Sequence, residues 1–483
     1  MAALERSLIR TSSGVILLAL VSLATFAEDW DPTPKGDVDA GGDKRRVPIV
    51  FVHGGNGAGE QFERQAMHFT SNGYPGTWIA AFDYSTAGAI GRRRGPGQPA
   101  SGASRASAPQ GTPSGAPPVS LAATEVTEAL DKFIDEVRKR TGHAKVNLVG
   151  HSFGTLQSAR YLNDSTRAAK IAHYASMGGG PATNQGGVPS IAVSGIGDFA
   201  SRGQGPRASN GGVTAKMPDF QDHVMVCTSD EAFEAIYTFF NDGEKPKTMK
   251  IEPQAEPLVS GVVKSYVNNQ PLVGAKIEVW EVAQETGRRT KDKPLVTFVA
   301  TEDGRWGPFR AQPGQYYEFV IHDKALARPR HVYREPFYHN DRLVYFRISA
   351  AAEGYAPSPL DKAPKYLTDE NAVFNVRHQN GALLPGIMSL SVNGTEVCTD
   401  ELTPASTTTV ALYVVDGNEN GKSEFTKVED PAFTGPFIRS VDMYIPADPP
   451  GHVEFKLNKR VLNVPNWKGA ETGQIQVVFD DYR

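Results

Sequence analysis

The chain has 483 residues, which is too long for a single hydrophobic core, so two or three domains are expected. Lys and Arg number 50 and Asp and Glu number 54, for a formal net charge of −4. This balance, without a basic patch or acidic tail, gives no indication of a nucleic-acid partner. The two cysteines, Cys227 and Cys398, cannot form a disulfide framework, although a single bond between them is compatible with an exported protein.

The N-terminus has the pattern of a secretory signal peptide. Arg6 and Arg10 precede an apolar run at residues 14–23, and small residues follow up to Ala27. We therefore expect cleavage near Ala27 and a mature protein that is secreted or periplasmic. The alternative is an uncleaved membrane anchor, for which the apolar run is short. Residues 28–46 are expected to form a loose lead-in.

A buried strand is predicted at residues 47–52, which form a continuous apolar and β-branched run. It leads directly into His53-Gly54-Gly55, where glycine allows the backbone to come close to a bound substrate. We interpret His53 itself as structural. A helix over residues 60–72 and a short strand over residues 78–82 are expected next.

Residues 87–118 interrupt this pattern because they are rich in Gly, Ser, Pro and Ala and nearly devoid of large apolar side chains. Such a segment cannot bury enough surface to order itself, so a disordered insertion is expected. A mobile flap over the active site is the alternative. A long amphipathic helix is predicted over residues 119–140.

The centre of the sequence is Gly150-His151-Ser152-Phe153-Gly154, which follows an apolar run and precedes a helical pattern. This is the G-x-S-x-G nucleophile elbow in its expected strand–turn–helix context. The sharp turn exposes the serine oxygen, and the flanking glycines relieve the crowding. We therefore predict that Ser152 is a nucleophile. Further strands at 171–176 and 191–194, with a helix over 229–240, indicate a mostly parallel, doubly wound sheet.

A nucleophilic serine needs a base, and the base needs an acid that orients it. His223 is the preferred base because it precedes the last helix, where a loop returns over the elbow. The rival, His173, lies within a predicted buried strand. Asp198, which follows the penultimate strand, is the preferred acid. Its rivals are Asp222, which is too close to His223 in sequence to reach its Nδ1 easily, Asp219 and Asp164.

Residues 48–246 resemble the lipase/esterase family of α/β-hydrolases, and in particular secreted prokaryotic lipases with a β-rich C-terminal domain, among them archaeal long-chain lipases. The matching stretches are Phe51-Val52-His53-Gly54, Gln61-Phe62-Glu63 with Asn72-Gly73-Tyr74-Pro75, Val149-Gly150-His151-Ser152-Phe153-Gly154-Thr155, Ala168-Ala169-Lys170-Ile171-Ala172-His173, and His223-Val224 with Cys227-Thr228-Ser229. The resemblance implies an α/β-hydrolase domain over residues 47–246 and hydrolysis of carboxylic esters by Ser152 and His223. It also implies an oxyanion hole formed by the amides of Gly55 and Phe153.

The sequence departs from this family at two places. The family acid is expected directly after the strand that follows the elbow, where this chain has Gly178, so the prediction moves to Asp198. The apolar helical lid is replaced by the insertion at residues 87–118, which argues against interfacial activation and a long-chain preference.

After residue 246 the pattern changes to short alternating strands, which indicate antiparallel β structure. Residues 255–350 resemble a small β-sandwich of the carboxypeptidase-regulatory type, and residues 356–483 are expected to form a second β domain. Asp416-Gly417-Asn418-Glu419-Asn420-Gly421 imitates the start of a calcium loop, but the twelfth position is Lys427 rather than glutamate, so a hairpin turn is preferred. No metal or other cofactor is expected.

These observations predict a secreted serine ester hydrolase, a lipase or carboxylesterase acting on an ester or lipid substrate. One alternative is an extracellular polyester depolymerase. Another is a surface-binding protein with an inactive hydrolase scaffold. The β domains are expected to shape the acyl pocket, to contact a polymer or cell surface through aromatic residues such as Trp280, Trp306 and Tyr316, or only to stabilise the enzyme.

Overall fold

A computed structural model describes residues 43, 45–87, 123–200, 204–215, 217–218, 220–352, 355–379, 381–435, 437–448 and 450–481. The predicted signal peptide and the insertion therefore lie outside the described residues, apart from Ala87 at the start of the latter. Within the described part of the chain, no helix is both long and apolar enough to cross a bilayer.

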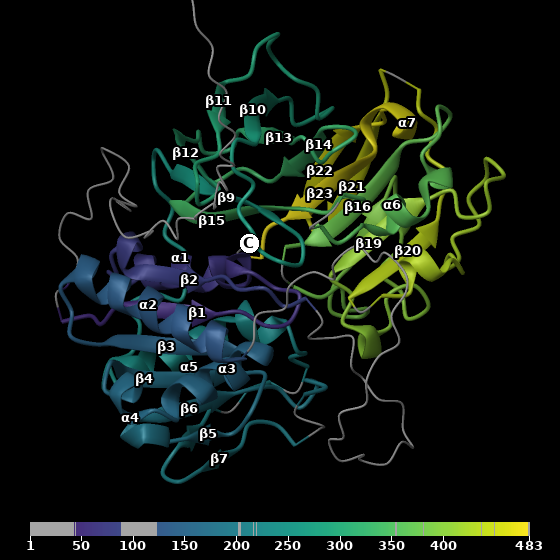
Figure 1. Cartoon of the computed structure of the whole chain (residues 1–483). Helices are drawn as coiled ribbons and strands as arrows, with labels where there is room; N and C mark the ends of the chain where they lie inside the picture. The colour runs from purple at the N-terminus through teal and green to yellow at the C-terminus, as the bar shows by residue number, and fades with distance from the viewer. Residues whose placement is uncertain are drawn as a thin grey trace, which may run out of the picture. The chain divides into compact units, whose positions relative to one another are not determined.

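A six-stranded parallel sheet forms the centre of the first region, as predicted (Figure 1). Its strands, in spatial order, are β2 (Ile79–Phe82), β1 (Ile49–Val52), β3 (Val146–His151), β4 (Ile171–Met177), β6 (Ser190–Val193) and β8 (Val213–Thr214). Every neighbouring pair is parallel. The carboxyl ends of the strands therefore meet at one edge of the sheet, where active sites of such folds are built. A separate small ladder pairs β5 (Ala182–Thr183) with β7 (Ala208–Ser209).

Helices cover both faces of this sheet because its strands are apolar on both sides. In β1, Ile49 and Phe51 pack into one core together with residues of α1 (Glu63–Ser71) and α5 (Asp230–Phe240). Val50 and Val52 pack into the opposite core with residues of α2 (Ala123–Thr141) and α3 (Phe153–Leu162). The short helix η1 (Gly59–Phe62) precedes α1, and α4 (Ser165–Ala168) follows α3. The period of two along β1 thus produces the doubly wound arrangement.

The described residues of the C-terminal part are rich in β structure, as predicted, and form three sheets. Their strands are β9 (Leu258–Ser265), β10 (Lys276–Val282), β11 (Val296–Val299), β12 (Arg305–Arg310), β13 (Tyr316–His322), β14 (Arg330–Arg334), β15 (Asp341–Ile348), β16 (Val373–His378), β17 (Leu390–Val392), β18 (Thr395–Glu396), β19 (Ala411–Val415), β20 (Ile438–Asp442), β21 (His452–Leu457), β22 (Arg460–Pro465) and β23 (Gln474–Phe479). Two one-turn helices, α6 (Pro359–Lys362) and α7 (Gly469–Thr472), lie between strands.

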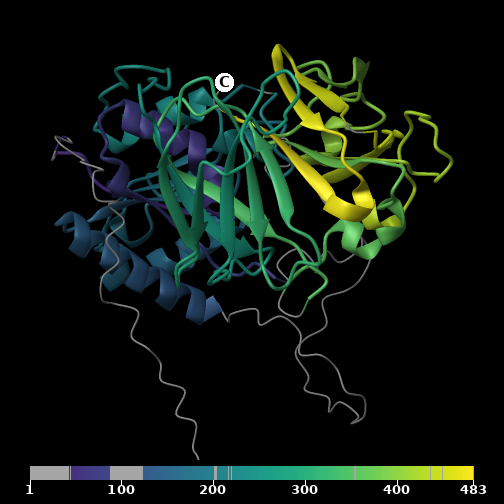
Figure 2. The same cartoon turned by 90° about the horizontal axis from the view of Figure 1, so that it is seen from above.

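The last strand joins the two predicted β domains into one sheet. β23 pairs in parallel with β14 on one side and with β16 on the other, so the order is β11-β10-β13-β14-β23-β16-β19-β20. In Figure 2 the yellow C-terminal strands lie beside green strands from earlier in the chain. The three-stranded sheet β12-β9-β15 shares a core with the first half of this sheet, and β18-β17-β21-β22 shares a core with the second half. The boundaries at 255–350 and 356–483 remain predictions.

Candidate active site

The nucleophile elbow has the predicted strand–turn–helix form. β3 ends at His151, α3 begins at Phe153, and Ser152 between them has φ 50° and ψ −117°. A positive φ is strained for a residue with a side chain and is found where the surrounding structure enforces it. The amide of Ser152 donates to the carbonyl oxygen of Met177 at 2.9 Å, which fixes the turn to the neighbouring strand.

The glycines of the elbow are required by close backbone contacts. A Cβ at position 154 would lie 2.2 Å from the carbonyl oxygen of Val52, and one at position 150 would lie 2.8 Å from Oγ of Ser158. The His-Gly-Gly loop approaches the serine equally closely, because a Cβ at Gly54 would lie 2.9 Å from Cβ of Ser152. Any side chain at these positions would force the turn open.

Ser152, His223 and Asp198 form a continuous hydrogen-bonded chain. His223 Nε2 lies 2.7 Å from Ser152 Oγ, and His223 Nδ1 lies 2.8 Å from Asp198 Oδ1. Burial by itself raises the pKa of Asp198, but the hydrogen bond and electrostatic interaction with His223 and the hydrogen bond from the amide of Ala200 outweigh it and leave the pKa below its usual value. Asp198 is therefore an ionised acceptor that holds a proton on Nδ1 and leaves Nε2 to accept the serine hydroxyl.

Two further contacts place the His223 loop. A Cβ at Gly195 would lie 2.2 Å from the carbonyl oxygen of Gln221, so only glycine lets the Asp198 loop come this close. His151 Nε2 donates to the carbonyl oxygen of His223 at 2.8 Å. Burial and the neighbouring His223 lower the pKa of His151 to about 3, so its imidazole is neutral. His151, the middle residue of the elbow motif, thus helps to hold His223 in place, a contact that the sequence alone did not indicate.

Gly178, the position where the resemblance predicts an acid, lies beside the candidate acid Asp198. It follows β4 with φ 52°, and a Cβ there would lie 3.0 Å from Asp198 Oδ2 and 3.3 Å from His151 Nε2. The loop after β4 and the loop after β6 therefore converge on the same side of His223. A carboxylate from either loop would occupy nearly the same volume, so the presence of Asp198 goes with a glycine at position 178.

The rival residues have other roles in the structure. His173 Nδ1 lies 3.0 Å from Asn147 Oδ1 at the amino-terminal half of the sheet. Asp222 Oδ1 accepts the amides of Val224 and Met225, both at 2.9 Å, and burial raises its pKa. Asp164 caps α4 by accepting the amides of Thr166 and Arg167. Asp219 lies outside the described residues.

The backbone amides of Gly55 and Phe153, which are predicted to bind an oxyanion, are free to donate hydrogen bonds in the described part of the structure. In the loop, the amides of Gly54, Asn56 and Gly57 donate to Gln61 Oε1, Thr86 Oγ1 and the carbonyl oxygen of Gly54 respectively. Neither Gly55 nor Phe153, by contrast, has a hydrogen-bond partner for its amide among the residues that the structure describes. Phe153 is also the first residue of α3, where the helix dipole favours negative charge.

His53 is structural, as interpreted from the sequence. It is fully buried, and its Nδ1 donates to the carbonyl oxygen of Gly54 at 2.9 Å while its Nε2 accepts from the amide of Tyr84 at 3.2 Å. Burial lowers the pKa of His53 to about 4. A neutral His53 therefore ties the loop to the segment that follows β2.

Phe199 was not predicted as a site residue. Its ring centroid lies 4.1 Å from that of His223, and its side chain is 45% exposed. It covers one face of the imidazole while remaining open to solvent. Only its place directly after Asp198 in the sequence could have indicated this contact.

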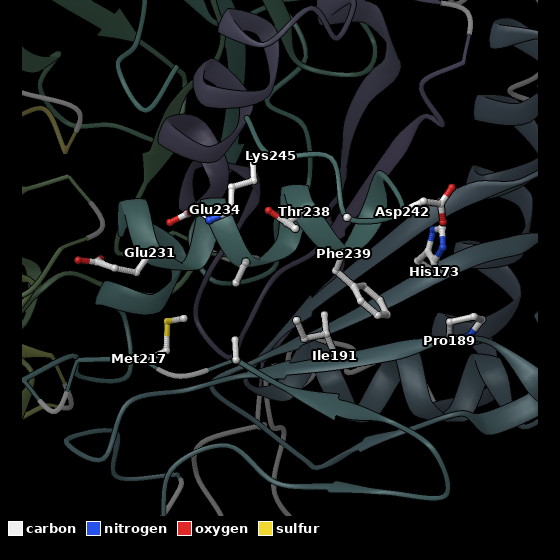
Figure 3. A pocket seen from close by; sticks show the side chains of 13 residues that line it. His173, Pro189, Ile191, Met217, Glu231, Glu234, Thr238, Phe239, Asp242 and Lys245 are labelled. Atoms are coloured by element: carbon white, nitrogen blue, oxygen red, sulfur yellow. Dashed lines mark hydrogen bonds and ion pairs between the residues drawn. The ribbon is translucent and has the colours of Figure 1, made fainter. Parts of the chain in front are cut away.

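The structure also contains a cavity of about 750 Å³ between α5, the strands β4 and β6, and the segment that follows β8 (Figure 3). Figure 3 shows Phe239 of α5 and Ile191 of β6 pointing toward each other across it. His173 lies at one end of the cavity. Ser152, His223 and Asp198 do not line this cavity.

The β-rich part differs from one prediction. Trp280 and Trp306 are only 8% and 3% exposed, so the expectation that they form an exposed aromatic surface is wrong. Trp306 packs in the core between the two sheets, and Trp280 is covered by the guanidinium of Arg289 at 3.9 Å from the ring centroid. Tyr316 is partly buried against the second core.

The metal and cysteine predictions can be examined within the described residues. These contain no group of three or more His, Cys, Asp or Glu side chains that could hold a metal ion. Asp416 accepts the amides of Asn420 and Gly421, which forms a turn. Cys227 and Cys398 are both free and buried.

Comparison with known proteins agrees with this architecture. The model of the alpha/beta hydrolase fold matches residues 47–210, the lipase C-terminal domain model matches residues 256–351, and a second C-terminal domain model matches residues 386–483. No curated protein matches the sequence significantly.

Three of the matched solved structures are distant in sequence and have low TM-scores. A bacterial membrane phospholipase A described as a virulence factor is 14% identical, with a TM-score of 0.27 and coverage of 42% of this chain and 81% of that one. A structure from a study of carboxylesterases of the thaumarchaeon Nitrososphaera gargenis is 11% identical, with a TM-score of 0.27 and coverage of 42% and 92%. A Bacillus licheniformis lipase in its propeptide form is 12% identical, with a TM-score of 0.28 and coverage of 70% and 83%.

The fold and the family models indicate a lipase/esterase-like α/β hydrolase. The chain is therefore similar to lipase-like α/β-hydrolases that carry a β-rich C-terminal part.

Proposed function

We propose that the protein is a secreted serine hydrolase of carboxylic esters, and that Ser152, His223 and Asp198 are its catalytic triad. The observation that carries the proposal is the hydrogen-bonded chain from Ser152 Oγ through His223 to Asp198, at 2.7 and 2.8 Å. These distances are those that general-base activation of a hydroxyl requires.

In the proposed mechanism, His223 Nε2 accepts the proton as Ser152 Oγ bonds to the ester carbonyl carbon. The carbonyl oxygen becomes an oxyanion that the amides of Gly55 and Phe153 bind. Collapse of this intermediate breaks the ester C–O bond, and His223 returns its proton to the departing alcohol. A water molecule then attacks the acyl-enzyme in the same way, which releases the carboxylic acid and restores Ser152.

Hydrolysis of nitrophenyl esters, from acetyl to palmitoyl, by the mature protein without its signal peptide tests this proposal. We expect turnover that Ser152→Ala reduces by roughly 10⁴- to 10⁶-fold, because the nucleophile is lost while the oxyanion donors remain. The chain length with the highest kcat/KM separates an esterase from a lipase. A folded protein that hydrolyses none of these esters, or whose Ser152→Ala variant is as active as the wild type, contradicts the proposal.

Export is the second part of the proposal, supported by Arg6, Arg10 and the apolar run at residues 14–23. Expression with the native N-terminus, followed by mass determination of the extracellular or periplasmic product, tests it. Cleavage near Ala27 is expected. A full-length chain retained in the cell contradicts export.

A further inference from the structure

We propose that Asn269 and Arg347, two residues of the β-rich part, are positioning residues for the oxyanion loop, which we define as residues 53–60. The inference rests on the proposed function, because it assigns these residues to holding the Gly55 amide. It makes the β-rich part a component of the hydrolytic site.

Asn269 reaches the loop from the turn after β9. It is 5% exposed and has φ 55°, a left-handed conformation that asparagine tolerates better than most residues. Its Nδ2 donates to the carbonyl oxygen of Gly57 at 2.9 Å and to that of Tyr84 at 3.0 Å. One side-chain amide therefore ties the oxyanion loop to the segment after β2.

Arg347 reaches the loop from β15, whose side chains alternate between two environments. Val344, Phe346 and Ile348 are buried in the β-sandwich core, whereas Tyr345 and Arg347 point the other way, toward the hydrolase part. Arg347 Nη1 donates to the carbonyl oxygen of Asn56 at 2.7 Å. Its Nε donates to Asn269 Oδ1 at 3.1 Å, which links the two positioning residues.

The charge of Arg347 is balanced within the same loop. Its Nη1 lies 3.2 Å from Glu60 Oε1, and both side chains are nearly buried, at 6% and 7% exposure. A buried pair of this kind is strongly dependent on the presence of both partners. The pair is therefore a specific link between β15 and the oxyanion loop.

These contacts determine the direction of the Gly55 amide. The Gly54 carbonyl oxygen accepts from the Gly57 amide at 3.2 Å and from His53 Nδ1 at 2.9 Å. Because a peptide group is planar and trans, the N–H of Gly55 points away from that carbonyl. Asn269 holds the Gly57 end of this turn and Arg347 holds Asn56, so the turn cannot rotate without breaking bonds to the β-rich part.

Asn269→Gly and Arg347→Lys test the proposal in the full-length protein. Glycine keeps the left-handed backbone of position 269 accessible, so this variant removes the side chain without adding strain. Lysine keeps the charge opposite Glu60 but cannot contact Asn56 and Asn269 together. We expect kcat on nitrophenyl butyrate to fall by about 10- to 100-fold in Asn269→Gly and by less in Arg347→Lys, with KM within about twofold.

Inhibition by an alkylboronic acid is the readout that a merely structural role would not change. Its tetrahedral adduct on Ser152 places an oxygen where the oxyanion forms, so its inhibition constant should rise by the same factor as kcat/KM falls. Thr70→Val is the matched control, because Thr70 Oγ1 contacts His339 Nε2 at 2.7 Å between the same two parts of the chain but lies outside the loop. This variant should keep wild-type kcat.

Three results would overturn the inference. The first is an unchanged kcat in Asn269→Gly. The second is an equal loss in Thr70→Val, and the third is a fall in kcat without weaker boronate inhibition. Ser152→Ala separates these outcomes from failure of the proposed function, since serine-dependent turnover in the wild type leaves the proposed function standing even when Asn269→Gly has no effect.

Discussion

The two sides of the candidate active site are supported by different parts of the chain. On the base side, His223 and Asp198 take their hydrogen bonds from the parallel-sheet region, including the one from His151. The β-rich part touches this side through apolar contacts, where Val224 packs with Ala382 and Leu384. On the oxyanion side, Asn269 and Arg347 of the β-rich part donate hydrogen bonds directly to the loop.

The two sides differ because His223 and the Gly55 amide must be oriented by different kinds of contact. A histidine held by two directional side-chain contacts is already oriented, so non-directional packing behind its loop is sufficient. A glycine amide has no side chain by which it can be held, so its direction depends on the hydrogen bonds of the neighbouring peptides. Asp83 provides another link between the oxyanion loop and the β-rich part. It accepts a hydrogen bond from the amide of Gly59 at 2.8 Å and forms an ion pair with Lys264 of β9 at 2.5 Å.

The largest effect among the tests of this comparison is expected on the base side. Asp198→Asn should lower kcat by about 10³- to 10⁴-fold, because an amide stabilises the wrong tautomer of His223 and cannot stabilise the imidazolium. If the two sides act independently, adding Asn269→Gly should multiply this loss by the factor that it causes alone. Steady-state kinetics of the two single variants and the double variant measure this, and a double variant no slower than Asp198→Asn contradicts independence.

A smaller change in kcat is expected when the carboxylate is moved from the loop after β6, which carries Asp198, to the loop after β4, which carries Gly178. In an Asp198→Ala background, Gly178→Asp should raise kcat about tenfold, because the new carboxylate enters the volume that Asp198 leaves. In the wild-type background the same substitution should lower kcat, since two carboxylates would crowd one site and φ is 52° at position 178. The four variants should be compared at equal folded fraction, judged by circular dichroism. No gain in the Asp198→Ala background would show that the loop after β4 cannot present an acid to His223.

The smallest effect concerns stability rather than turnover. Burial lowers the pKa of His53 to about 4 and that of His151 to about 3, whereas both titrate near 6.5 when unfolded. As the pH falls from about 6.5 toward 4, the unfolded chain binds protons that the folded chain does not, so the free energy of unfolding decreases. Each histidine contributes at most about 1.4 kcal/mol per pH unit.

Urea unfolding at several pH values between 7 and 4 measures this dependence. His151→Gln removes one titrating group while keeping an amide donor for the carbonyl oxygen of His223, so its stability should depend less steeply on pH. An unchanged slope would indicate that His151 is not buried in its neutral form.

Much of the parallel-sheet region was predictable because its signals are local. Continuous apolar runs at 47–52 and 146–149 predict strands buried on both faces, and both are found in the sheet. The elbow motif places a turn at Ser152, and its positive φ follows from the residues on either side. His223 and Asp198 were selected by their order after the elbow, and the structure brings both to Ser152.

The exposure of aromatic residues in the β-rich part was not predictable in this way. Trp306 occurs in a short alternating segment, and alternation alone does not say which face of a strand is covered. The second sheet that covers it includes strands remote in sequence, among them β23, whose Val478 lies in the same core. The exposure expected for Trp280 and Trp306 was wrong for this reason.

The sequence by itself determined the class of fold, the position of the elbow and the identity of the base and acid candidates, because each depends on neighbouring residues or on chain order. Only the tertiary structure decided that Gly178 faces Asp198, that His151 orients His223, and that Asn269 and Arg347 hold the oxyanion loop. Arg347 and Asn56 are separated by 291 positions and meet in a single 2.7 Å hydrogen bond. Such a contact depends on how two separately formed sheets pack, and no local pattern in either segment encodes it.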